Sequence, residues 1–419
     1  MEPYISEYSS RWGEFSEFLD VDIQKEKWDK VVAIPACRES VLLPRLLDSI
    51  LQSSDALKIA VVIVVNHTET ASEEIKQDNQ KTLEFLCADV KKRMSYGVLW
   101  CFWKNYDLFV IDRASPGREL PHKQGVGLAR KISCDFALLL PQFSCWIRTT
   151  DADAVLPEDY WIDPIEAEGA AAWRWPYEHI RTGRGQCDKA IHLYELFLQI
   201  WEQGLSYAKS PYAWQAMGSC LGLSRKYYAM VRGYPLKQAG EDFYVLNKLQ
   251  KVGNVVAISH VQPIQLESRI SDRVPFGTGA AMQNLINTFE RQQKYQIYHP
   301  QTFYFLKILL ECAENAIEKQ SCDDWDSFFS DDIREIHKIM KIDQALLRAI
   351  KHHSKNRNQH FHVWFDAFRT MKWMHSIRDK VLGLIDIDIY LEHGENEELR
   401  LKSLPILFST ESGKFKKDE

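Results

Sequence analysis

The sequence has little that would point to a membrane, a disulfide framework or a nucleic-acid partner. No apolar run approaches the ~20 residues that a membrane span needs, and the longest, residues 59–65, fits a buried strand. The nine cysteines are scattered without a CxxC pair, which favours free thiols in a reducing compartment. A net charge of −6 gives no reason to expect nucleic acid as a partner.

The bulk composition is that of an ordinary globular protein of two or three domains. Of the 419 residues, 45% are hydrophobic and 26% are charged, which is the usual balance for a soluble chain. The N-terminal stretch MEPYISEYSSRWGEF is polar and acidic, and it lacks the basic region and apolar core of a secretory signal. We therefore expect a cytoplasmic protein without a transmembrane segment, while peripheral contact with a membrane stays an open alternative.

The first two thirds of the chain alternate between short apolar runs and amphipathic segments. Apolar runs predict strands at residues 30–35, 58–66, 108–111, 143–147, 169–175, 214–223 and 255–258. Helical spacing predicts helices at residues 39–52, 71–93, 125–140, 188–203, 224–231 and 243–251, and a further helix that starts at Pro157. Strands that are apolar on both faces and alternate with helices indicate an α/β fold, in which helices flank a mostly parallel sheet.

Beyond about residue 282 the sequence shows only helical patterns, at residues 301–318, 326–340, 343–353 and 359–382. We therefore divide the chain into three parts. These are an N-terminal lead-in at 1–28, a sheet domain at 29–281, and a helical C-terminal region at 282–419. The sequence does not indicate a role for the helical region, and residues 412–419 are expected to be frayed.

An acidic motif, Asp151-Ala152-Asp153, follows the strand predicted at residues 143–147. In parallel sheets, ligands bind beyond the carboxyl ends of the strands. Glu39 and Asn66 follow two other predicted strands and are expected at the same edge. Two carboxylates there suit a hard divalent cation that takes oxygen ligands and keeps open positions for phosphate. A surface turn is the alternative, because aspartate is common in turns.

Five short motifs, taken in order, resemble those of family 2 glycosyltransferases of the GT-A fold. They are Val32-Ala33-Ile34-Pro35-Ala36 with Glu39, Gly127-Leu128-Ala129-Arg130, Asp151-Ala152-Asp153, Gly218-Ser219, and Arg232-Gly233-Tyr234 followed by Glu241-Asp242. Each motif alone is weak, and together they cover roughly residues 30–260. The resemblance implies a Rossmann-like sheet domain. It also implies transfer of one sugar from a UDP- or GDP-sugar to an acceptor hydroxyl, with Mn²⁺ or Mg²⁺ as cofactor.

The resemblance also implies roles for individual residues. Asp153 would bind the metal, with Asp151 beside it near the ribose. Asp242 would be the catalytic base, with Glu241 as a second contact to the acceptor, and a single displacement would invert the anomeric configuration. The predicted nucleotide-sugar-binding residues are Pro35, Ala36, Arg38, Glu39, Asn66, Lys123, Gly127, Arg130, Asp151 and Arg273.

The chain departs from the family pattern at several points. Arg38 stands where the family usually has asparagine, and Lys131 stands where asparagine is frequent. The second strand ends in Asn66-His67-Thr68, without the acidic turn that is common there, so the identity of the base is left open. The Gln-x-x-Arg-Trp motif of processive polysaccharide synthases is absent, as are their membrane spans. A single addition of sugar therefore fits better than polymerisation.

The chemistry needs cations near the diphosphate and a base near the acceptor. The leaving diphosphate accumulates negative charge, which a metal at Asp153 or cationic side chains would neutralise. The candidate cations are Lys123, Arg130, Arg269 and Arg273, for which solvated surface charge is the alternative. Asp242 lies in the first turn of a predicted helix, where the helix dipole favours its ionised form. An acidic helix start without catalytic function would show the same residues.

Two other functions stay open from the sequence. A nucleotidyltransferase can share the sheet and the paired carboxylates, but it normally carries a Gly-rich basic loop where this chain has residues 35–39. A scaffold protein with a degenerate transferase domain is the second alternative, and the intact Asp151, Asp153 and Asp242 argue against it. The acceptor could be a glycan, a lipid-linked sugar or a small molecule. Residues 268–279 fit either a lid or a plain connector, and His260 fits either a metal ligand or a structural residue.

Overall fold

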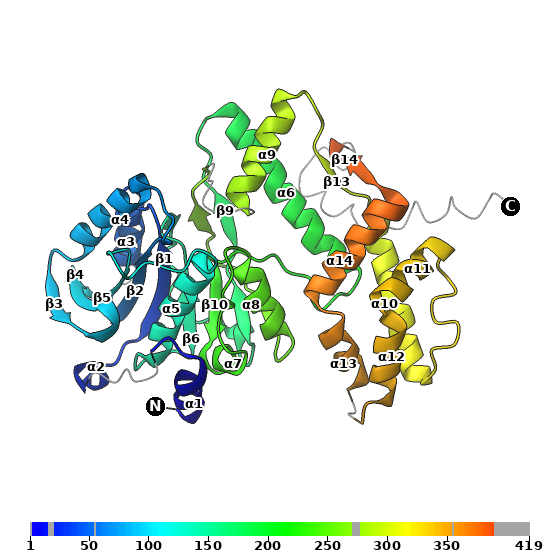
Figure 1. Ribbon diagram of the computed structural model, residues 1–419, viewed down its shortest axis with the longest axis horizontal. Helices are drawn as coiled ribbons and strands as arrows, with labels where there is room; N and C mark the ends of the chain where they lie inside the picture. The colour runs from blue at the N-terminus through cyan, green and yellow to red at the C-terminus, as the bar shows by residue number, and fades with distance from the viewer. Residues whose placement is uncertain (1, 16–20, 54–55, 270–276, 354–355, 389–419) are drawn as a thin grey trace. The chain divides into compact units, whose positions relative to one another are not determined.

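The computed structural model describes residues 2–15, 21–53, 56–269, 277–353 and 356–388, and the chain divides into two compact units (Figure 1). Unit 1 comprises Met1–Arg184 and Ala216–Ala280, and unit 2 comprises Gly185–Gln215 and Ala281–Glu419. Residues 185–215 fall inside the sheet domain expected from the sequence, but they group with the helical region.

Unit 1 is built on a mixed nine-stranded sheet with a parallel centre. The strand order is β11-β8-β10-β6-β1-β2-β5-β4-β3. The central parallel strands are β6 (Trp146–Thr149), β1 (Lys30–Ala36), β2 (Ile59–Asn66) and β5 (Tyr106–Arg113). β1 and β2 are buried along almost their whole length, because each is a continuous run of small and β-branched apolar residues. The predicted parallel arrangement is confirmed for this centre of the sheet.

Antiparallel strands extend the sheet on both sides. At one edge lie β4 (Val98–Trp103) and β3 (Val90–Arg93). On the other side lie β10 (Leu221–Ser224), β8 (Ala172–Arg174) and β11 (Val255–Ala257), of which β8 and β11 pair in parallel. A second, three-stranded sheet joins β7 (Ala154–Val155), β12 (Ile264–Leu266) and β9 (Tyr177–His179).

Helices cover both faces of the central strands. From one face, α3 (Leu43–Ser53) and α4 (Glu73–Leu86) pack their apolar sides into a core with β1, β2 and β5. On the other face, α5 (Gly125–Leu139) contacts β1 and β2, and Phe136 lies 5.2 Å from Phe109 of β5, measured between ring centroids. The remaining helices of unit 1 are α1 (Pro3–Trp12), α2 (Val21–Lys25), α7 (Arg225–Met230), α8 (Glu241–Gln250) and the 3-10 turns η1 (Ser95–Gly97) and η2 (Ile165–Ala167).

Several predicted elements of unit 1 have wrong bounds or do not form. The helix predicted at 71–93 ends at Leu86, and its last residues pair with β4 as β3. The helix predicted from Pro157 is a turn, because the side chains of Tyr160 and Trp161 are both buried in the core of the sheet domain. The strand predicted from residue 143 begins only at Trp146, and Phe143 is 68% exposed. The strand predicted at 214–223 begins at Leu221.

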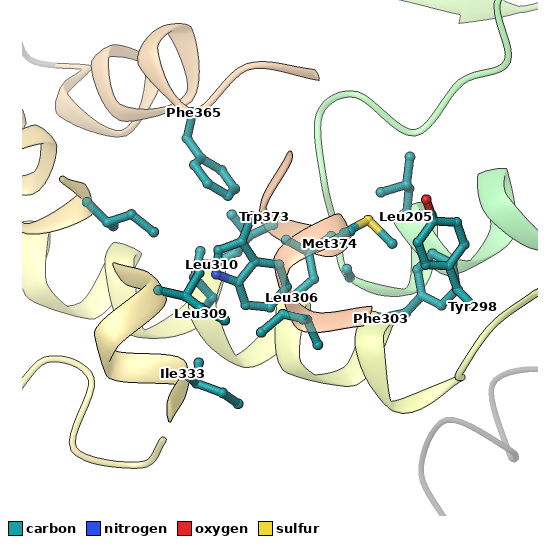
Figure 2. Close-up of a cluster of buried hydrophobic side chains, with 14 of the residues drawn as sticks. Leu205, Tyr298, Phe303, Leu306, Leu309, Leu310, Ile333, Phe365, Trp373 and Met374 are labelled. Carbon is teal, nitrogen blue, oxygen red and sulfur yellow. The ribbon is translucent and has the colours of Figure 1, made fainter. Parts of the chain in front are cut away.

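Unit 2 is mainly helical. Its helices are α6 (Gly185–Tyr207), α9 (Thr278–Glu290), α10 (Gln301–Lys319), α11 (Asp331–Met340), α12 (Ile342–Lys351), α13 (Arg357–Trp364), α14 (Ala367–Ile377) and the short π-helix η3 (Arg378–Leu382). Figure 2 shows its core, in which Phe303 and Leu306 of α10 lie with Trp373 and Met374 of α14. A short antiparallel pair, β13 (Gln296–Tyr298) and β14 (Leu384–Asp386), was not predicted.

The single helix predicted at 359–382 is interrupted. Asp366 is the N-cap of α14, and its side chain accepts a hydrogen bond from the backbone N of Arg369. Such a cap begins a new helix, so α13 ends at Trp364.

No helix in the described part of the chain combines the length and the apolar character needed to cross a bilayer.

Candidate active site

The predicted acidic residues gather where the parallel strands of unit 1 end. Asp151 and Asp153 follow β6, and Glu39 follows β1. β10 runs antiparallel to β6, with Leu221 opposite Thr149, so Gly218 precedes β10 at the same edge of the sheet. α8 begins at Glu241, and hydrogen bonds described below tie this helix start to Gly218. The sheet topology therefore collects residues from four separate segments.

Arg130 is the side chain that connects these segments. It lies in α5 and is only 4% exposed. Its Nε donates to Glu241 Oε1 over 2.7 Å, its Nη2 donates to Asp151 Oδ1 over 2.6 Å, and its Nη1 donates to Gly218 O over 3.2 Å. A buried guanidinium with two carboxylate partners has its charge and its donors largely satisfied. Arg130 therefore holds Asp151 and Glu241 in fixed positions.

Gly218 is required by this close approach. A Cβ atom built on Gly218 would lie 2.5 Å from Arg130 Nη2, well inside contact distance. Thr149 Oγ1 also donates to Gly218 O over 2.7 Å. The glycine of the Gly218-Ser219 motif therefore allows the arginine, the end of β6 and the residues before β10 to meet.

Asp242 is held beside this network and keeps part of its surface exposed. Its Oδ2 accepts a hydrogen bond from Gly218 N over 3.1 Å, and its Oδ1 accepts one from Phe243 N over 2.7 Å. Burial and then the neighbouring Glu241 carboxylate raise the pKa of Asp242 to about 7, against the opposite effect of Arg130. A carboxylate with this pKa can accept and release a proton near neutral pH, as a general base must.

Asp153 belongs to a second group of charges at the same edge. Arg269 Nη2 donates to Asp153 Oδ2 over 2.8 Å, and the same nitrogen donates to Glu39 Oε1. The Glu39 side chain is 4% exposed, that of Asp153 18% and that of Arg269 28%. The two carboxylates, which are 114 residues apart in the sequence, are thus joined by one guanidinium. Asp151 and Asp153 therefore face different arginines.

The ends of β1 and β2 are joined by a network of buried amides. Asn66 Nδ2 donates to the carbonyl oxygens of Ala36 and Val64, each over 3.1 Å. Asn79 of α4, which is fully buried, donates to Asn66 O over 2.8 Å and accepts a hydrogen bond from Arg38 N over 2.9 Å. The Asn66 amide donors thus serve the backbone. Asn79 was not predicted, and its only signal was a polar residue on the apolar side of a helix.

Several predicted binding residues have structural roles or lie apart from the two charge groups. Pro35 and Ala36 are buried inside β1, in register with residues 64 and 65 of β2. The Arg38 guanidinium lies 3.2 Å from the Glu74 carboxylate at the surface. Lys123 and His260 are exposed. Arg273, most of the segment 268–279 and residues 412–419 lie outside the described residues.

Gly127 serves close packing. A Cβ atom at Gly127 would lie 2.5 Å from Lys237 O, and Gly127 N donates to that same oxygen over 3.0 Å. This contact holds the segment that precedes Glu241 against the start of α5. The glycine therefore acts on the site through the position of α8.

The side chains of this site can be compared with the ligands that the predicted metal ion needs. Among the described residues, no group of three or more His, Cys, Asp or Glu side chains is placed to hold a metal ion. Mg²⁺-type sites, however, often use one or two carboxylates together with substrate phosphates and water. Asp153 has the oxygen ligands and the partial exposure that such a site needs. The residues present therefore fit a cation whose other ligands come from a diphosphate and from water.

Comparison with known proteins gives little by sequence. No protein-family model matches the chain, and no curated protein matches it. Among solved structures, the chain is similar to a mannosyltransferase, PcManGT, from Pyrobaculum calidifontis in complex with GDP-Man and Mn²⁺. The identity is 12%, the match covers 99% of this chain and 95% of the other, and the TM-score is 0.36. The function proposed below therefore rests on the motifs and on the geometry of the site.

Proposed function

We propose that this chain is a nucleotide-sugar-dependent glycosyltransferase of the GT-A type that adds one sugar to an acceptor hydroxyl with inversion. The observation that carries the proposal is the Arg130 network, which brings Asp151, Glu241 and Gly218 together and places Asp242 next to them. These residues come from the motifs that resemble family 2 glycosyltransferases. Physical contact between motifs that lie 111 residues apart supports their reading as one site.

Asp242 is the proposed catalytic base. Its two backbone hydrogen bonds fix the carboxylate, and its pKa of about 7 leaves it largely ionised at slightly alkaline pH. A positioned general base contributes typically ~100-fold or more to rate. In the transfer step, Asp242 takes the proton of the acceptor hydroxyl as that oxygen attacks the anomeric carbon and the diphosphate leaves. One displacement on one face of the sugar inverts its configuration.

Glu241 is proposed as a positioning residue. Its carboxylate accepts the Arg130 Nε hydrogen bond, and its side chain is 5% exposed. Because the buried Arg130 guanidinium already occupies this carboxylate, we propose that Asp242, and not Glu241, meets the acceptor hydroxyl. Glu241 also contributes to the raised pKa of Asp242 through its charge. It therefore tunes the base beside it.

The donor side of the site is proposed to lie along Asp151, Asp153 and Glu39. Asp153 would hold a Mn²⁺ or Mg²⁺ ion, and such an ion neutralises the charge that develops on the leaving diphosphate. Arg130 holds Asp151 through a hydrogen bond, next to the place proposed for the ribose. UDP- and GDP-sugars are the candidate donors, and the Asn66 network at the ends of β1 and β2 shapes the proposed base pocket.

Nucleotide titration tests the binding part of this proposal. The melting temperature of the full chain is measured with UDP or GDP, with and without MnCl₂, because a ligand that binds only the native state stabilises it. A rise that needs both nucleotide and metal supports the transferase. The absence of a response to either nucleotide would favour the degenerate scaffold. Sugar nucleotides that raise the melting temperature are then incubated with acceptors and the products read by mass spectrometry.

The variant Asp242→Asn tests the catalytic part. Asparagine keeps the size, and its one carbonyl oxygen can still accept the Gly218 hydrogen bond, but the hydrogen bond from Phe243 N is lost and the side chain cannot take a proton. We expect nucleotide binding within about two-fold of the native value and a loss of about 100-fold or more in transfer rate. The matched control is Asp48→Asn, which changes an exposed carboxylate that pairs with Lys104. Transfer by Asp242→Asn at the native rate would show that another group is the base.

A further inference from the structure

Arg269 lies where the predicted metal would bind. Its Nη2 contacts carboxylate oxygens of both Glu39 and Asp153. An arginine side chain is always protonated, so it cannot leave these carboxylates by losing a proton. A cation that binds Asp153 must therefore meet or displace a positive charge that is already present.

The backbone positions Arg269 at this point. β12 ends at Leu266, which pairs with Ala154 of β7, the residue directly after Asp153. Ser268 Oγ then donates to Ile180 O over 2.6 Å. Arg269 follows this serine directly. The register between β12 and β7 therefore places Arg269 beside Asp153. The contact is a built feature of the fold.

Charge makes the arginine and a divalent cation alternatives for the same pair of carboxylates. Two carboxylates and one guanidinium carry a net charge of −1, and replacing the guanidinium by a divalent cation makes it neutral. Keeping both cations would place like charges at contact distance in a partly buried site, where they repel strongly. A bound diphosphate changes this balance, because it gives the displaced guanidinium a new anionic partner.

We propose that Arg269, which pairs with Asp153 and Glu39, is an internal competitor for the divalent cation at Asp153, so that the ligand-free protein holds metal weakly. This inference rests on the cation site of the proposed transferase, and it adds the residue that regulates entry of the metal. Arg269 keeps the carboxylates paired while no donor is present. Metal and nucleotide then bind cooperatively. The diphosphate of the nucleotide gives the displaced Arg269 a new partner, and the metal ion neutralises the carboxylates that Arg269 leaves.

Metal binding without nucleotide tests this directly. The full native chain, Arg269→Gln and the control Arg45→Gln are titrated with MnCl₂, and free Mn²⁺ is followed by electron paramagnetic resonance. Arg45 is a matched control because it forms an exposed ion pair with Glu267, two residues before Arg269. We expect Arg269→Gln to bind Mn²⁺ about 10- to 100-fold more tightly than the native chain, because a charged hydrogen bond no longer has to break. Arg45→Gln should bind as the native chain does.

Equal Mn²⁺ binding by the native chain and Arg269→Gln, or no binding by either, would overturn the inference. Circular dichroism and the melting temperature verify that the variant is folded. If Arg269→Gln does not fold, Arg269→Met replaces it, since methionine also removes the charge and keeps an unbranched side chain. The methionine variant is expected to bind Mn²⁺ more tightly than the native chain, and unchanged binding would overturn the inference.

A nucleotide titration of the same proteins separates this inference from the proposed function. If UDP or GDP with MnCl₂ stabilises both proteins while their affinity for Mn²⁺ alone is equal, Arg269 is not the competitor and the transferase assignment stands. If neither nucleotide stabilises either protein, the proposed function itself fails.

Discussion

The two units differ in what they bury. Among the described residues of unit 1, eleven buried side chains are those of aspartate, glutamate, histidine, lysine or arginine: Glu39, His67, Asp107, Asp112, Arg130, Lys131, Asp135, Arg148, His179, Arg225 and Glu241. In the described part of unit 2 only His337 and Asp366 are of these types. Unit 2 instead packs leucine, isoleucine and aromatic side chains around Trp373 (Figure 2).

Buried apolar side chains and buried charged side chains contribute differently to a protein: the first mainly stabilise the fold, and the second mainly fix the positions of polar groups. Apolar burial stabilises a fold without fixing the direction of any group, and it contributes about 25 cal/mol per Å². Buried charges add little net stability, because desolvation opposes their attraction. They do fix geometry when each has a partner, as with Asp135, which accepts hydrogen bonds from Tyr8, Tyr228 and Lys131. Unit 1 therefore carries the oriented charges that a reaction needs, and unit 2 resembles a structural core.

The largest expected effect comes from removing the charge that connects the site. Arg130→Met leaves Asp151 and Glu241 without their shared partner, and breaking a buried ion pair in this way costs about 3–5 kcal/mol. We expect the free energy of unfolding, measured by urea denaturation, to fall by that amount, and transfer to be lost. The matched change Arg45→Met removes an exposed arginine and should cost less than about 1 kcal/mol. Equal losses would contradict the comparison.

A core substitution in unit 2 is the counterpart. Trp373 is fully buried in α14, and Trp373→Ala is expected to lower the free energy of unfolding by about 3–5 kcal/mol. Below its new melting temperature, the variant should retain its response to nucleotide. Leu347→Ala, at a site that is 43% exposed, is the control. Loss of nucleotide binding by a folded Trp373→Ala protein would show that the units do not divide the work in this way.

The effects of pH are expected to be gradual, and they sharpen the role of Asp242. Below pH 7 the transfer rate is expected to fall by about ten-fold per pH unit, because only the ionised base acts. The raised pKa of about 7 also means that the folded state binds a proton more tightly than the unfolded state. Stability therefore decreases as pH rises from about 4 to 7. Asp242→Asn should weaken this decrease, measured by urea denaturation across that range, and an unchanged slope would argue against the raised pKa.

Much of the parallel centre could be predicted because its signal is local. β1 and β2 are largely apolar runs and β5 contains one at residues 108–111, and the residues that follow β1 and β6 are expected at the same edge of the sheet. The partners of those residues could not be predicted. The Arg130–Glu241 and Arg269–Glu39 contacts join residues 111 and 230 positions apart. Only the packing of α5, α8 and the small sheet determines them.

The helix predictions at 359–382 and 71–93 are wrong because a local apolar pattern continues past the residue at which the helix ends. The pattern at 359–382 was read as one helix because its apolar spacing continues across the break at Asp366. An aspartate before an apolar segment is a capping signal, and it was outweighed by the spacing. At 71–93 the helical spacing was extended into residues 90–93, whose pairing with β4 is decided by long-range contacts.

The absence of a side chain at Gly127 has a consequence for anyone who redesigns this protein. Even a methyl group there would push against the backbone of Lys237, and the displacement would pass along the chain toward Glu241 and Asp242. The start of α5 and residues 235–242 are thus expected to move together when either one is displaced. A library that varies either half alone would mostly sample misaligned sites, so the two stretches are best exchanged as a single cassette.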